Sequence, residues 1–109
     1  MGFSPQVNEL VLTNSTTDVT VVTAPAASTI RMVSSITVYN ADTVSATVEL
    51  KIDVSATEKR LVSQILIAGE SLVYEVKQNL DSTMKIEVVL AGAITTNQLE
   101  CTAVYADYS

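Results

Sequence analysis

The feature that most restricts the fold of this chain is a strict alternation of apolar and polar residues. Between residues 44 and 54, every second position is apolar: Val44, Ala46, Val48, Leu50, Ile52 and Val54. Successive side chains of a β-strand point to opposite faces of its sheet, so this pattern predicts a strand with one buried and one solvated face. Similar alternation follows at residues 84–88 and 99–105. Because Val, Ile and Thr dominate the chain and lose rotamer freedom in a helix, we expect strands and no helix.

Short polar segments rich in turn-forming residues separate the alternating runs. Residues 14–18 and 40–43 are expected to be loops between antiparallel strands, and Ser55–Glu58 is expected to be a turn. Eight strands are predicted, at residues 6–13, 18–23, 29–40, 44–54, 59–67, 71–77, 84–90 and 98–106. Their number and spacing predict an all-β protein built as a single antiparallel β-sandwich, either jelly-roll or immunoglobulin-like in topology.

The chain of 109 residues has the length of one domain. We assign residues 6–109 to the β-sandwich domain and residues 1–5, which include Pro5, to an N-terminal arm. Residues 24–28 are small and include Pro25, so this segment is expected to carry the chain from one sheet to the other. The shared phase of the strands predicts a core of Ile36, Val38, Val48, Leu50, Ile52, Leu72, Ile86, Val88, Leu99 and Cys101.

The chemistry-bearing residues are sparse. Four carboxylates, Glu49, Asp53, Glu87 and Glu100, occupy polar positions of the strands and are predicted to lie on solvated faces, where Lys51 and Lys85 would form cross-strand pairs. The chain has no histidine, which removes the usual general base and the most common metal ligand. We therefore expect no catalytic residues and no enzymatic activity.

Cofactors and metals are not expected either. Residues 14–18 are the best candidate for a calcium loop, but they contain one carboxylate, Asp18, and turn formation explains them better. Cys101 has no second cysteine as a disulfide partner, and its apolar phase predicts a buried, unreactive thiol. The formal charge of −6 opposes binding to nucleic acid or to an anionic membrane surface. The first residues lack the basic and apolar regions of a signal peptide, so none is expected.

Three segments carry a resemblance to a known family. They are residues 30–42, which end in the turn Asn40-Ala41-Asp42; residues 44–50, in which Val alternates with polar residues; and residues 66–72, in which Ala68-Gly69-Glu70 opens the next strand. In texture and order, residues 28–106 resemble the small β-sandwich virion proteins of tailed bacteriophages. Jelly-roll modules of this size are best known there as head decoration, or cement, proteins.

This resemblance implies a non-enzymatic structural protein that binds the major capsid protein, or another virion protein, and stabilises the phage capsid. It also implies a homo-oligomer, with a trimer favoured, and a location in the virion after assembly in the host cytoplasm. Phe3, Pro5 and Tyr108 are the residues that we expect at contacts. The alternatives are a tail, neck or fibre component of the virion and, from another class, a carbohydrate-binding or adhesion module.

Overall fold

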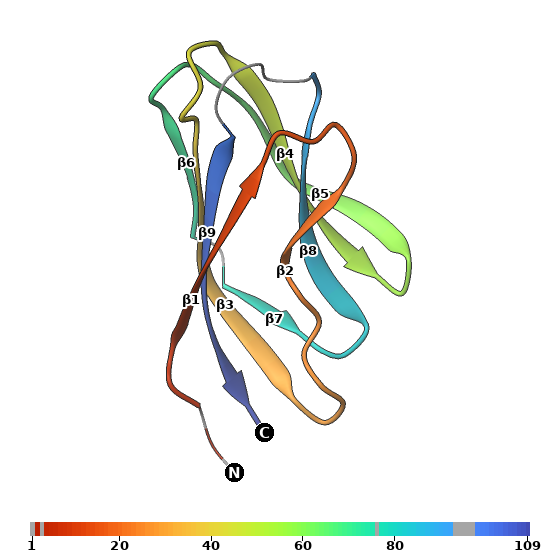
Figure 1. Cartoon of the computed structure of the whole chain (residues 1–109). Coiled ribbons are helices and arrows are strands. Elements are labelled where there is room, and N and C mark those ends of the chain that lie inside the picture. The colour runs from red at the N-terminus through yellow and green to blue at the C-terminus, as the bar shows by residue number, and fades with distance from the viewer. Residues whose placement is uncertain (1, 3, 76, 93–97) are drawn as a thin grey trace.

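The computed structural model describes residues 2, 4–75, 77–92 and 98–109, and these residues form two β-sheets packed face to face (Figure 1). The strands are β1 (Val7–Thr13), β2 (Val19–Val22), β3 (Ile30–Tyr39), β4 (Ala46–Val54), β5 (Thr57–Leu66), β6 (Ser71–Tyr74), β7 (Gln78–Leu80), β8 (Met84–Leu90) and β9 (Leu99–Tyr108). Within the described residues there is no helix long and apolar enough to cross a membrane. The all-β sandwich predicted from the alternation is confirmed.

The strand order identifies the topology that the sequence left open. Sheet A has the order β1-β9-β3-β6, with β7 also paired to β3, and sheet B has the order β2-β8-β4-β5; all pairs are antiparallel. The chain thus pairs as one long hairpin, β1 with β9, β2 with β8, β3 with β6 and β4 with β5. Rolling up that hairpin brings β3 beside β9 and β4 beside β8, which is the jelly-roll arrangement.

The core lies between the two sheets and contains all ten residues predicted for it, each at most 7% exposed. Further buried side chains complete it, including Val22, Leu66, Leu80 and Leu90. Burial of each large aliphatic side chain contributes roughly 1.5–3 kcal/mol, so the apolar phase of the strands is the main source of stability.

Two local predictions were wrong. The turn predicted at Ser55–Glu58 is a tighter one, because Ser55 and Ala56 both have positive φ (51° and 70°) and β5 begins already at Thr57. Two consecutive positive-φ residues match the right-handed twist of a hairpin, although Asn-Gly is the usual sequence for them. The second miss is β7, which is three residues long and falls between the strands predicted at residues 71–77 and 84–90.

The connections between the two sheets include the two turns that carry the resemblance. Residues 24–28 carry the chain from sheet B to sheet A, as predicted. The loops 14–18 and 40–43 also cross between the sheets, so the strands that they join do not pair with each other.

Asn40 is fully buried, and its side-chain amide donates to the backbone oxygens of Val44 and Leu66, both at 2.9 Å. The backbone N–H of Gly69 donates to the backbone oxygen of Asn40 at 2.9 Å. The asparagine turn and the Ala68-Gly69-Glu70 turn therefore form one hydrogen-bonded unit at an end of the sandwich.

The two ends of the chain lie side by side (Figure 1). The N–H of Gly2 donates to the backbone oxygen of Ser109 at 3.0 Å, and the N–H of Ser4 donates to that of Asp107 at 2.8 Å. At these two residues, the segment assigned to an N-terminal arm lies along β9 of its own chain. Its contact with a neighbouring subunit stays a prediction.

Candidate functional site

The outer face of sheet A is a broad, largely uncharged surface, which we call the apolar face. Side chains of directly paired residues share a face, so the register places three rows across the strands. The first row is Leu10, Thr102, Thr37 and Val73; the second is Leu12, Glu100, Tyr39 and Ser71; the third is Asn8, Val104 and Ser35. Leu10 is 62% exposed and Val73 is 52% exposed, and Glu100 is the one charged residue in these rows.

The apolar face continues toward the chain ends. Ile30 pairs with Tyr108, and both are exposed. Beside them, the bulge between Val33 and Ser35 opens a shallow depression of about 180 Å³. Its lining is formed by Met32, Val33, Ser34, Lys77, Asn79 and Ala106. Of the predicted contact residues, Tyr108 therefore lies on this face, Pro5 is exposed before β1, and Phe3 lies outside the described residues.

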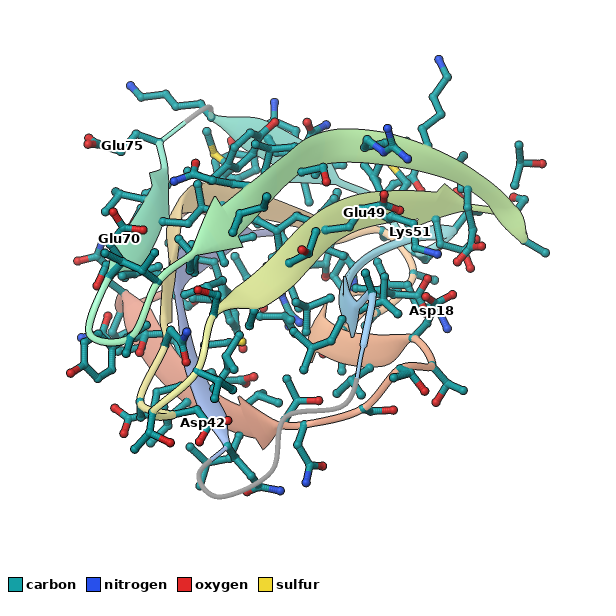
Figure 2. All side chains as sticks on the ribbon, turned by 90° about the horizontal axis from the view of Figure 1, so that it is seen from above. Asp18, Asp42, Glu49, Lys51, Glu70 and Glu75 are labelled. Atoms are coloured by element: carbon teal, nitrogen blue, oxygen red, sulfur yellow. The ribbon has the colours of Figure 1, made fainter. Side chains whose placement is uncertain are left out.

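The outer face of sheet B, which we call the charged face, has the opposite character. The guanidinium Nε of Arg60 lies 2.7 Å from Glu49 Oε2, and Lys51 Nζ lies 2.7 Å from Asp18 Oδ1 and 3.4 Å from Glu58 Oε1. Lys85 Nζ lies 3.7 Å from Glu87 Oε2. Figure 2 shows Glu49 and Lys51 along β4, with Asp18 on the segment that leads into β2. The predicted cross-strand pairing is thus present for Lys51, which reaches Glu58 on β5, whereas Lys85 pairs with Glu87 of its own strand.

Three carboxylates converge on this face. One oxygen each from Asp18, Glu58 and Glu87 lies within 4.8 Å of the others, and we call this group the acidic cluster. Hydrogen bonding to Asp18 and then to Glu87 raises the pKa of Glu58 to about 7. The hydrogen bond from Lys51 holds the pKa of Asp18 below its ordinary value. The three carboxylates of the cluster therefore share the proton bound by Glu58 and the hydrogen bonds donated by the Lys51 ammonium.

The prediction that Glu87 lies on a solvated face was wrong, since the residue is only 6% exposed. Glu87 does occupy the outward phase of β8, but β8 is an inner strand of sheet B, and Glu87 is flanked there by Thr20 of β2 and Lys51 of β4. Its Oε1 atom is buried without a hydrogen-bond partner. Sequence reasoning could not find this cluster because its members are far apart in the chain and meet only through sheet pairing.

A second polar group, the Arg31 network, lies at the end of the core between β3, β9 and β1. Arg31 donates to both carboxylate oxygens of Asp107, at 2.8 and 3.0 Å, and to the backbone and hydroxyl oxygens of Thr23. Its guanidinium lies 4.3 Å from the ring centre of Tyr105, whose hydroxyl donates to Glu9 Oε1 at 2.6 Å. The bond from Arg31 lowers the pKa of Asp107. The contact of Arg31 with Thr23, which follows β2, links sheet A to sheet B. The charges of Arg31 and Asp107 are paired with each other.

The single thiol is not available for chemistry at the surface. Cys101 is fully buried, and burial raises its pKa to about 12. A thiol of this kind is protonated at neutral pH and is a poor nucleophile.

Comparisons with known proteins bear on the fold. No protein-family model matches the chain, and no curated protein sequence matches it. A chain from Bacillus endospore appendages, described as disulfide-linked pili, superposes with a TM-score of 0.59 at 10% identity, covering 99% of this chain and 88% of that one. A chain in the structure of infectious bursal disease virus, Gx strain, superposes with a TM-score of 0.50 at 11% identity, covering 98% of this chain but 31% of the viral one. Both likenesses concern the sandwich fold.

Proposed function

We propose that this protein is a non-enzymatic structural subunit that binds a larger protein assembly through its apolar face. The observation that carries the proposal is the contrast between the two outer surfaces: exposed Leu10, Leu12, Tyr39 and Val73 share one face, whereas ion pairs such as Lys51–Asp18 and Arg60–Glu49 lie on the other. Contiguous exposed apolar surface marks interaction sites in proteins that are otherwise soluble. Binding of another protein through the outer face of a sheet requires no reactive group, which agrees with the expectation that this protein has no catalytic activity.

Within this class we propose a head decoration protein that binds and stabilises a phage capsid. The resemblance of residues 28–106 to small phage virion proteins supports this station, as does the structural likeness to a chain of a virus. The likeness to disulfide-linked pili supports a structural role as well, but the single cysteine here is buried in the core. A disulfide between subunits would require the core to open, so we favour non-covalent binding in a virion over a pilus of that type.

The test is attachment to particles. Leu10→Lys and Val73→Lys place a charge on the apolar face, and Ile65→Lys is the matched control, since Ile65 is 63% exposed and lies opposite Thr47 on sheet B. We expect Leu10→Lys and Val73→Lys to reduce co-sedimentation with capsids that lack the protein about tenfold or more, while Ile65→Lys binds like the wild type. Equal binding by all three variants would contradict the proposed surface.

The station in the virion is tested separately by quantifying the chain in purified virions. A decoration protein is present at a copy number set by the capsid lattice, and particles that lack it should release DNA at a lower temperature. Recovery of the chain in tails or necks would favour the alternative station. Absence of the chain from purified virions would overturn the virion proposal.

A further inference from the structure

We propose that the acidic cluster of Asp18, Glu58 and Glu87 binds a hard divalent cation, with Ca²⁺ as the best fit. This site lies on the charged face, opposite the surface proposed for assembly, and its occupancy is independent of that proposal. Its three ligands would come from the segment before β2, from β5 and from β8.

The first argument is the state of Glu87. Its side chain is only 8% exposed, and its Oε1 atom has no hydrogen-bond partner. The nearest ammonium, Lys85 Nζ, lies 3.7 Å from the other oxygen, beyond a normal hydrogen bond. A buried carboxylate oxygen without a donor is unfavourable, because nothing replaces the water that it has lost. A cation among the three carboxylates supplies the missing partner.

The second argument is charge. Lys51 pairs with both Asp18, at 2.7 Å, and Glu58, at 3.4 Å, so two carboxylates share one ammonium. With Lys85 beside Glu87, three carboxylates face two ammonium groups, so the cluster keeps an excess negative charge above about pH 7, where Glu58 is ionised. A divalent cation would take the place that the Lys51 ammonium holds between Asp18 and Glu58.

The third argument is geometry. The converging oxygens lie within 4.8 Å of one another. Ca²⁺–oxygen distances are about 2.3–2.6 Å, so one Ca²⁺ at the centre reaches all three oxygens with little backbone movement, whereas Mg²⁺ requires about 2.0–2.1 Å and near-ideal octahedral geometry. The Asp18 and Glu58 side chains are 29% and 38% exposed, which gives the ion a path and leaves room for water ligands.

The experiment uses the full chain after treatment with EDTA and removal of the chelator. Calorimetric titration with CaCl2 should give one ion bound per chain, and millimolar CaCl2 should raise the melting temperature by several degrees over NaCl of equal ionic strength. An equal shift in both salts would mean screening only and would overturn the site, as would no binding heat together with no shift.

Three variants decide which residues hold the ion. Glu87→Gln and Glu58→Gln should each weaken Ca²⁺ binding about tenfold or more, whereas Glu49→Gln, on the same face but outside the cluster, should bind like the wild type. Glu58 is exposed, so its variant keeps the test valid if Glu87→Gln does not fold. Lys51→Met removes the competing ammonium and should tighten Ca²⁺ binding, a result that a purely structural ion pair does not give. Unchanged binding in both the Glu58 and the Glu87 variants would overturn the proposal.

Discussion

The two outer faces of the sandwich both belong to antiparallel sheets but differ in surface chemistry. On sheet A, the outward positions of β1, β9 and β3 carry mainly leucine, threonine, valine and tyrosine, with Glu100 as the charged exception; on sheet B, those of β4, β8 and β5 carry lysine, arginine, glutamate and aspartate beside a few uncharged residues such as Ile65. Both sheets contribute equally to one core, so stability does not require this difference. The contrast instead separates a surface suited to binding protein from one kept soluble by paired charges.

The largest expected loss of stability comes from a charge placed at a buried position of β4, and this substitution tests the assignment of faces. Leu50 is fully buried, and its neighbour Glu49 points outward. Leu50→Asp should lower the free energy of unfolding by several kcal/mol, because it buries an unpaired charge. Glu49→Ala should change it by about 0.5 kcal/mol or less. Denaturant unfolding measures both, and a stable Leu50→Asp beside an unfolded Glu49→Ala would mean that the faces are inverted.

The next effect separates the ion pairs on the charged face from the half-buried Arg31–Asp107 pair, which joins β3 and β9 within sheet A. Arg31→Gln removes a bidentate, half-buried pair with Asp107 and should cost about 1.5–3 kcal/mol. Arg60→Gln removes a pair in which the arginine side chain is 67% exposed, and it should cost about 0–1 kcal/mol. Similar losses for the two variants, measured by urea unfolding, would contradict the view that the pairs of the charged face serve solubility more than stability.

A smaller effect follows from the pKa of Asp107. The folded pKa is lowered by Arg31, so between the folded and unfolded values the unfolded chain binds more protons. Stability from this group is therefore fully present above about pH 4 and is lost as the pH falls through the folded pKa. The stability difference between the wild type and Asp107→Asn should shrink between about pH 5 and pH 2 in thermal melts. A difference that stays constant would contradict the pairing.

The smallest effect on stability is expected on the apolar face. Leu10→Lys changes a side chain that is 62% exposed, so the free energy of unfolding should change by about 0.5 kcal/mol or less. Its effect should appear in capsid binding and not in self-association, because the oligomer contacts are expected at Phe3, Pro5 and Tyr108: light scattering at micromolar concentration should show the same oligomer, with a trimer expected, for the wild type and the variant. A wild type that is monomeric would exclude the oligomer for the isolated protein, and a smaller species for the variant would place oligomer contacts at Leu10.

The sequence was informative wherever a residue's role depends on its near neighbours. Alternation predicted the strands and all ten core residues, because a side chain's face follows from its position within a strand. The jelly-roll order was not predictable in this way, since it depends on pairs such as Val7 with Tyr105. Nor was the acidic cluster, which joins Asp18, Glu58 and Glu87 through that pairing. The strand β7 was missed because three residues are too few to show a period.

The pairing of β1 with β9 also determines when sheet A can form during folding. The hydrogen-bonded neighbour of β1 in sheet A is β9, and β9 lies between β1 and β3. Sheet A therefore cannot close until β9 has been synthesised, and its closure brings together residues as distant as Val7 and Tyr105. Loop-closure entropy makes such contacts slow to form, and β-rich topologies of this kind fold in about milliseconds to seconds. Until β9 is in place, β1 and β3 expose unpaired edges, so delayed synthesis or truncation within β9 should favour aggregation over a partly folded monomer.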